Sequence, residues 1–379
     1  MTLSKDSTVQ GGLEQVSGVD RVASLTGIRA VAALLVVGTH SAYTTGKYTH
    51  GYFGLVCSRM EMGVPIFFVL SGFLLFGPWV KSLVTGGPPP SVSLYAWHRV
   101  RRIMPAYTVT VLVAYLVYHF RTARPNPGHT WMGLLRNLTL TQIYTKNYLG
   151  SYLHQGLTQM WSLAVEVAFY VVLPLLAYLL LSVVCQRRWQ PRLLLAALAG
   201  LTLLTPAWLV LVHTTHWLPS SARLWLPTYL AWFVAGMMLA VLQAMGARCY
   251  ALAAIPLATV CYFIASTPIA GAPTTTPSGL SEALFKAVFY AVVAALAVAP
   301  LGLGDHGWYA RLLASRPMVW LGEISYEIFL IHLVTMEIAM VEVLRYRIYT
   351  GSMLNLFVVT LLITIPLAWL LHRFTRIRG

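Results

Sequence analysis

The sequence predicts an all-α, polytopic membrane protein of about ten transmembrane helices. Of its 379 residues, 58% are hydrophobic and only 10% are charged, whereas soluble domains average about 45–50% apolar and 25% charged residues. The mean hydropathy is +0.70. A spanning helix needs roughly 20 mainly apolar residues, and such stretches recur from Leu25 to the C-terminus without a long polar block. We therefore expect one membrane domain.

The chain begins with a polar segment. Residues 1–24 lack an apolar core followed by a small-residue cleavage site, so we do not expect a cleaved signal peptide. We predict a cytoplasmic N-terminal tail over 1–24, a transmembrane domain over 25–372, and a cytoplasmic C-terminal tail over 373–379.

Ten apolar segments are candidate spans, namely 25–46, 63–84, 103–120, 157–181, 193–213, 225–245, 249–268, 283–303, 317–340 and 354–372. With the N-terminus inside, most arginines fall in inner connections, as the positive-inside rule requires. The arginine-rich composition fits a GC-rich bacterial genome. We therefore expect a bacterial inner (plasma) membrane protein with both termini cytoplasmic. The exception to the charge rule is the connection 121–156, whose outer cations are Arg121, Arg124, Arg136 and Lys146.

The same connection, 121–156, is the longest in the chain. It opens with a proline-rich stretch and contains WMGLLRNLTLTQIY, which we predict to lie on the outer surface as a short amphipathic helix. The segment 269–281 is predicted to be a flexible outer turn.

The net charge of +15 does not indicate a nucleic-acid partner, because the cations are spread over short loops rather than gathered in one aromatic-laced patch. The four cysteines have no CxxC spacing, so neither a zinc site nor a disulfide framework is predicted. Topology accounts for the charge better than any polyanionic partner does.

Charged or histidine side chains inside the predicted spans are functional candidates, because a charge at a helix centre costs roughly 2.5–3.5 kcal/mol on insertion scales. The first span holds Arg29 and His40, and the fourth holds Glu166. The ninth span carries four more, which are Glu323, Glu327, His332 and Glu337.

Arg29 and His40 are predicted to face the same side of the first helix. Their spacing corresponds to three turns within about 20°, with a rise of roughly 16 Å between them. They would then line one wall of a cavity, with Arg29 near the cytoplasmic end and His40 in the outer half. The alternatives are a snorkelling arginine at the interface and a buried, hydrogen-bonded packing histidine.

Glu166 is predicted to lie at a depth similar to that of His40. A carboxylate there would fix the tautomer of the imidazole and stabilise its charged form during proton transfer. A structural pairing with an arginine is the competing interpretation. In the ninth span, Glu323 and Glu327 share a face and His332 is near it, but no metal is predicted because no HExxH or comparable ligand spacing occurs.

Five segments carry a family signature in a fixed order, namely SLTGIRAVAALLVVGTH, GVPIFFVLSGFLLF, HRVRRIMPAY, WSLAVEVAFYVVLPLL and ISYEIFLIH. With them the chain resembles the membrane acyltransferase-3 family of bacterial integral-membrane O-acyltransferases. The spacing of Arg29 and His40 is similar to the family's first-helix signature, and that of Arg99 and Arg102 to its second.

The resemblance implies a ten-helix enzyme that uses acetyl-CoA or another acyl-CoA from the cytoplasm. Its acceptor would be a hydroxyl of a carbohydrate or glycolipid in the cell envelope. By the same resemblance His40 matches the catalytic base, and Glu166 matches the glutamate of the WSLxxE segment. Arg29, Arg99 and Arg102 match the basic residues near the donor. Other residues that we expect to line the cavity are Ser71, Trp161, Glu323, Glu327 and His332.

One position departs from the family pattern, because Pro65 stands where many members have an acidic residue. No role for a carboxylate is carried over there. Many members also have an additional C-terminal soluble domain, and we expect this chain to be the stand-alone form.

The cytoplasmic arginines agree with a coenzyme A donor, since guanidinium groups bind phosphates through charge-assisted hydrogen bonds. The positive-inside rule alone would also place arginines there. A secondary transporter or lipid flippase remains the rival hypothesis, because it also places charges inside a helical bundle. The acceptor is left open, with an actinobacterial glycolipid such as a trehalose ester as one candidate.

Overall fold

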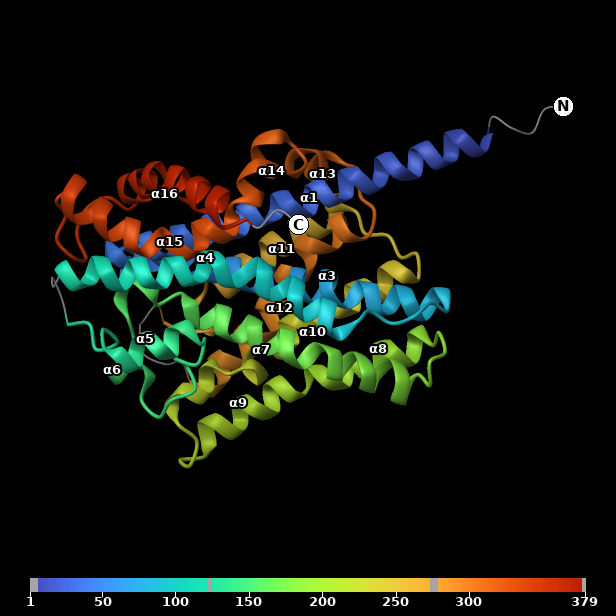
Figure 1. Cartoon of the computed structure of the whole chain (residues 1–379), viewed down its shortest axis with the longest axis horizontal. Helices are drawn as coiled ribbons and strands as arrows, with labels where there is room; N and C mark the ends of the chain where they lie inside the picture. Colours follow the sequence, from blue (N-terminus) through green and yellow to red (C-terminus); the bar gives the residue numbers. More distant parts are fainter. Residues whose placement is uncertain (1–5, 122–124, 273–278, 377–379) are drawn as a thin grey trace.

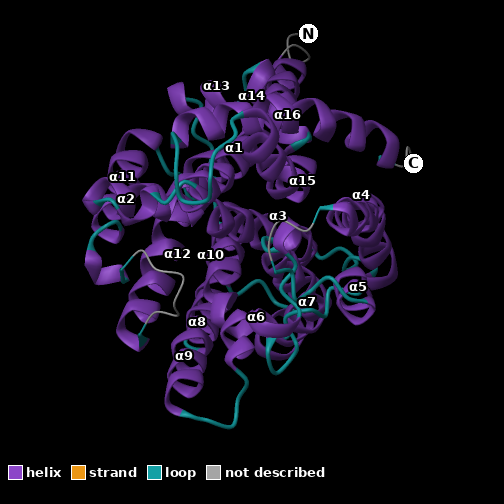
Figure 2. Ribbon diagram, turned by 90° about the vertical axis from the view of Figure 1, so that its left-hand side faces the viewer, coloured by secondary structure: helices purple, strands orange, loops and turns teal. Residues whose placement is uncertain are grey.

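The computed structural model describes residues 6–121, 125–272 and 279–376, and all regular structure in these ranges is helical (Figure 2). The predicted all-α class is confirmed. Its α-helices are α1 Asp6–Thr44, α2 Gly51–Ser58, α3 Gly63–Thr85, α4 Val92–Phe120, α5 Trp131–Leu138, α6 Tyr148–Ser151, α7 Met160–Ala177, α8 Pro191–Thr202, α9 Leu204–Thr214, α10 Leu226–Ala244, α11 Ala251–Ala265, α12 Leu280–Gly302, α13 Trp308–Leu313, α14 Arg316–Glu323, α15 Ser325–Ile338 and α16 Met353–Thr375.

Within the described ranges, eight helical segments are long and apolar enough to cross a membrane, and a bent pair makes a ninth. Each of the ten predicted segments overlaps a helix, but two of them differ from the prediction. The segment 249–268 forms only α11, with 15 residues, which is short of the roughly 20 that a bilayer requires. The segment 317–340 is divided into α14 and α15, which meet at 68°.

The break between α14 and α15 follows from close packing against α1. Gly322 lies so near α1 that a Cβ atom there would be 2.0 Å from the Thr26 carbonyl oxygen. The hydroxyl of Ser325 donates to the Gly322 carbonyl oxygen at 2.8 Å and satisfies one of the carbonyls at the end of α14. Apolar periodicity continues through Ile324, so the sequence pattern does not mark this bend.

The two ends of the bundle have different side chains. Helix α1 extends beyond the bundle at its N-terminal end (Figure 1), and it contains the candidate membrane span Arg21–Thr44. We call the end that contains Arg29 on α1, with Arg99 and Arg102 on α4, the arginine end. The other end, which α1 reaches at His40, is the histidine end.

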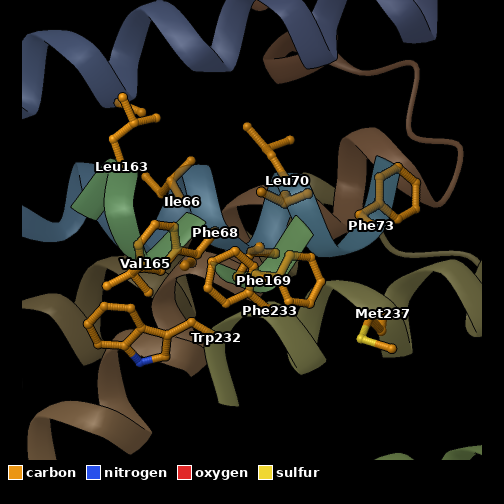
Figure 3. Packing of buried hydrophobic residues seen from close by; sticks show 14 of the residues in the cluster. Ile66, Phe68, Leu70, Phe73, Leu163, Val165, Phe169, Trp232, Phe233 and Met237 are labelled. Carbon is orange, nitrogen blue, oxygen red and sulfur yellow. The ribbon is translucent and has the colours of Figure 1, made fainter. Parts of the chain in front are cut away.

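The centre of the bundle is built on the crossing of α3 and α10, where small residues allow the backbones to touch. A Cβ atom at Gly72 would lie 2.0 Å from the Phe233 carbonyl oxygen, and one at Gly236 would lie 1.9 Å from that of Val69. Beside this crossing the Phe68, Phe169 and Phe233 rings stack, with centroid distances of 4.3 and 4.1 Å (Figure 3). The core therefore fixes α3, α7 and α10 relative to one another.

The long connection after α4 contains the short helix that the sequence predicted, α5. Trp131 at its start is 87% exposed. At its end, the hydroxyl of Tyr107 on α4 donates to the Asn137 carbonyl oxygen at 2.5 Å.

The same connection contains two neighbouring histidines. His129 Nδ1 lies 3.3 Å from Nε2 of the buried His154. Burial, followed by the neighbouring His129, lowers the pKa of His154 to about 3.

The predicted tails are only partly described. Residues 6–20 continue α1 as helix, and α16 runs on to Thr375. The segment 273–278 of the predicted outer turn, and the chain ends 1–5 and 377–379, lie outside the described residues.

Candidate active site

The arginine end contains a cavity of about 200 Å³ that we call the arginine cavity. Five helices supply its polar lining. They contribute Arg29 from α1, Ser71 from α3, Arg99 and Arg102 from α4, Glu166 and Tyr170 from α7, and Ser325 and Tyr326 from α15. The structure thus brings together the residues that the sequence predicted near the donor. Ser71 and Glu166 line the same cavity.

On the basic side of this cavity, one hydrogen-bond donor of Arg99 has no acceptor among the described residues. The Nε atom of Arg99 is buried and makes no hydrogen bond within the part of the chain that the structure describes. A buried donor without an acceptor is unfavourable, and an anionic ligand would satisfy it. Arg29 and Arg102 are close enough to repel each other electrostatically, which a bound anion would also relieve.

Glu166 is held by two hydroxyl groups. Its Oε1 atom accepts hydrogen bonds from Ser71 Oγ and Tyr170 Oη, both at 2.5 Å. Tyr170 lies one turn further along α7, so the helix itself positions this donor. The carboxylate is also near enough to Arg29 for an electrostatic attraction.

The predicted pairing of Glu166 with His40 is therefore wrong. The two residues have similar calculated depths, but depth along a helix says nothing about which neighbour the side chain faces. Glu166 faces the arginine cavity, whereas the His40 ring contacts α15.

His40 forms a pair with His332, a fully buried residue of α15. His40 Nδ1 lies 2.8 Å from the Val36 carbonyl oxygen and 3.2 Å from His332 Nε2, and the ring centroids are 5.0 Å apart. His332 Nδ1 in turn lies 2.7 Å from the Phe329 carbonyl oxygen. Two histidines from opposite ends of the sequence are thus linked in one chain of hydrogen bonds.

The hydrogen-bond partners assign the neutral tautomers of both rings. A carbonyl oxygen only accepts, so His332 Nδ1 carries its proton and His332 Nε2 presents a lone pair. His40 Nδ1 must then be the N–H that points between Val36 and His332. The remaining nitrogen, His40 Nε2, is left unprotonated and able to accept a proton.

His40 does not line the arginine cavity with Arg29, contrary to the prediction. Phe329 belongs to that lining. The Phe329 ring lies 5.9 Å from that of His332 and 6.2 Å from that of Phe67, which also lines the cavity. The aromatic pair therefore connects the cavity wall to the histidine pair.

The other predicted cavity residues lie elsewhere. Trp161 lines a second cavity, and Glu323 is exposed. Glu327 is buried and its Oε1 lies 2.9 Å from Nδ1 of His372 on α16. The shared helical face of Glu323 and Glu327 is lost because the chain bends between them, and neither these glutamates nor His332 lines the arginine cavity.

Sequence reasoning missed several polar residues inside the bundle. The tyrosines Tyr170 and Tyr326 line the arginine cavity. Lys286 on α12 donates to Glu61 at 2.9 Å. Its charge within the predicted span 283–303 was a usable signal, whereas Glu61 lies just before the predicted start of the span 63–84 and was overlooked.

The acyltransferase-3 model, described as an acyltransferase domain, matches residues 22–373. The chain belongs to the acyltransferase-3 family. Its membrane bundle is therefore an acyltransferase domain.

Three curated proteins are similar to this acyltransferase-3 chain. The peptidoglycan O-acetyltransferase OatA of Listeria monocytogenes is 25% identical over 86% of this chain and 52% of its own length. Acyltransferase MdmB of Streptomyces mycarofaciens is 31% identical over 45% of this chain and 43% of its own length. Protein 2 in picA locus of Rhizobium radiobacter is 32% identical over 28% of this chain and 52% of its own length.

The chain thus spans about half the length of the curated relatives it matches. No solved structure matches it.

Proposed function

We propose that this protein is an O-acyltransferase of the bacterial plasma membrane with both termini in the cytoplasm. It moves an acyl group, in the first instance acetyl, from cytoplasmic acyl-coenzyme A to a hydroxyl of a cell-envelope carbohydrate or glycolipid. The observation that carries the proposal is the joint presence of the arginine cavity and the His40–His332 pair, which supply an anion site and a base in one bundle.

The arginine cavity is suited to the donor. Coenzyme A carries phosphates, and Arg29, Arg99 and Arg102 provide planar guanidinium groups that pair with them. The buried Nε of Arg99 gains a partner when a phosphate oxygen is present. Apolar side chains such as Phe67 and Phe329 line the rest of the cavity and lead toward the histidine pair.

The histidine pair is suited to the chemical step. His40 Nε2 removes the proton of the acceptor hydroxyl while its oxygen attacks the thioester carbonyl carbon. The carbon–sulfur bond then breaks, and the His40 imidazolium returns the proton to the leaving thiolate. The products are an ester and free coenzyme A, and no covalent acyl-enzyme is needed.

His332 supports this role as a positioning residue. It accepts from His40 Nδ1 and so holds the ring in the tautomer whose Nε2 is the base. Glu166, which faces the donor cavity, keeps Ser71 and Tyr170 ordered and balances the charge of the arginines.

The test supplies radiolabelled acetyl-coenzyme A to membranes containing the protein and identifies the labelled product by mass spectrometry. We expect His40→Gln to lower transfer about 10²-fold to 10⁴-fold, which is the usual contribution of a general base. Binding of acetyl-coenzyme A should persist in this variant and weaken in Arg99→Gln. Full transfer by a normally folded His40→Gln protein would remove the base from the mechanism.

The transporter alternative has less support. Inverted repeats place a broken helix in each half of a transporter, whereas the described residues contain one bent helix pair, α14 and α15. Movement of a labelled sugar or lipid across vesicles without any acyl donor would favour that alternative.

A further inference from the structure

A second, larger cavity of about 330 Å³ lies outside the machinery described above. We call it the aromatic cavity. Its walls come from α3, α6, α7, α9, α10 and α12, together with Glu61 and the turn 220–224, and Val64 lines both it and the arginine cavity. The two cavities are therefore neighbours within one bundle.

One wall of the aromatic cavity is a continuous row of four rings. Trp161 lies 5.0 Å from Tyr229, Tyr229 lies 5.0 Å from Trp232, and Trp232 lies 5.9 Å from Tyr290, measured between ring centroids. The faces of aromatic rings carry partial negative charge. They attract the polarised C–H groups on the face of a sugar ring, while the sugar hydroxyls extend sideways to polar partners.

Polar groups in the same cavity have unused hydrogen-bonding capacity. Glu61 Oε1 accepts from Lys286 Nζ at 2.9 Å and from Tyr290 Oη at 2.8 Å. Among the described residues no group bonds its second oxygen, Oε2. Thr228 is only 9% exposed. Its hydroxyl is buried and has no partner in the described part of the chain. A hydroxylated ligand would satisfy both.

One polar residue of the aromatic cavity is near the histidine pair. Glu61 is close enough to His40 to interact with it electrostatically. A hydroxyl bonded to Glu61 would therefore lie in the same part of the bundle as His40.

We propose that the aromatic cavity binds the acceptor, as a glycosyl ring stacked on Trp161 and Tyr229 with hydroxyls bonded to Glu61 and Thr228. The proposal rests on the proposed function, since it names the substrate class of that same site. The pocket volume falls at the lower end of the range for small-molecule sites, which is roughly 300–1,000 Å³. That size suits one or two sugar rings rather than a polymer.

The test measures binding directly in purified protein reconstituted into nanodiscs. Saturation-transfer NMR would follow methyl glycosides of glucose, galactose, N-acetylglucosamine and N-acetylmuramic acid, together with trehalose. At least one of these sugars should bind saturably. We expect Trp161→Ala to weaken that binding at least tenfold, and Trp131→Ala, which changes a tryptophan that is 87% exposed, to leave it unchanged.

Thr228→Val is a second variant that we expect to fold normally. It keeps the shape of the side chain and removes a hydroxyl that has no partner among the described residues. The melting temperature should therefore be equal or higher while sugar binding falls. Binding that is unchanged in both Trp161→Ala and Thr228→Val would overturn the proposal. So would the absence of saturable binding by all five sugars, or displacement of the bound sugar by phospholipid alone.

Titration with acetyl-coenzyme A in the same samples separates this proposal from the proposed function. Sugar binding without donor binding or transfer would overturn the acyltransferase mechanism and retain the aromatic cavity as a sugar site. Acyl transfer to an acceptor that contains no sugar would retain the acyltransferase mechanism and overturn the assignment of the aromatic cavity as the acceptor site.

Discussion

At the scale of single residues, the His40–His332 contact decides which nitrogen can act as a base. The direction of the hydrogen bonds runs from His40 through His332 to the Phe329 carbonyl oxygen. Removing the acceptor nitrogen of His332 would release the His40 ring from its tautomer without altering the lining of the arginine cavity.

We therefore expect His332→Phe to lower kcat about 10-fold to 100-fold, which is typical when an orienting partner of a functional histidine is lost. The KM for the acyl donor should stay within a factor of two. His332→Gln should recover part of kcat, because its amide oxygen can accept from His40 Nδ1. Steady-state kinetics on the three proteins measure this, and an unchanged kcat in His332→Phe would show that the pair has no orienting role.

The site residues could be predicted individually from the sequence, but their partners could not. Arg29, Arg99 and Arg102 were expected near the donor, and the structure gathers all three in the arginine cavity. Spacing along one helix gives the side chain's face and height. It does not give the rotation of the neighbouring helix, so Glu166 was assigned to the wrong partner.

At the scale of helices, the α3–α10 crossing depends on glycine. Gly72→Ala would place a Cβ atom 2.0 Å from the Phe233 carbonyl oxygen, and backbone atoms cannot move aside cheaply. We expect a loss of about 1–3 kcal/mol in stability, as for other overpacked sites.

A control for this substitution lies on the same helix. A Cβ atom at Gly77 would meet no neighbouring atom within 4 Å, so Gly77→Ala should be neutral or slightly stabilising, as alanine favours helix. Thermal unfolding in one detergent compares both variants with the wild type. Equal melting temperatures would mean that the two helices separate easily at this point.

The helices themselves were largely predictable because apolar length is a strong signal. Two exceptions share a cause, which is that hydropathy records composition and not contact. The segment 249–268 is apolar enough, yet α11 stops at Ala265, where Arg59 Nε binds the Ala265 carbonyl oxygen at 3.0 Å. The bend at Ile324 arises from packing against α1 and leaves no trace in the apolar pattern.

At the scale of the whole molecule, stability should depend on pH through the buried loop histidine His154. In the folded protein the pKa of His154 is about 3, lowered by burial and then by His129, against an ordinary value near 6.5. Between these values the unfolded chain binds a proton that the folded protein does not. The stability that this histidine contributes is therefore complete above about pH 6.5 and is lost as the pH falls toward 3.

We expect the melting temperature to fall between about pH 6.5 and pH 4, with a contribution from His154 of at most about 1.4 kcal/mol per pH unit. His154→Phe keeps a ring against Tyr115, which stacks on His154 at 4.4 Å, and should flatten this dependence. His216→Gln, at an exposed histidine, serves as the control. A pH profile that is the same in His154→Phe and the wild type would contradict the assignment.

Under the mechanism proposed above, the His40–His332 pair also sets a time at which the protein can become fully active during its synthesis. Its two members are separated by 292 positions, and ribosomes add about 5–20 residues per second. About 15 to 60 s therefore pass between the synthesis of His40 and that of His332. A chain that ends before α15 contains Arg29, Arg99, Arg102 and His40. It lacks His332, the residue that orients the His40 ring in that mechanism. Under the proposed mechanism, translation must reach α15 before the nascent protein can transfer acyl groups at its full rate.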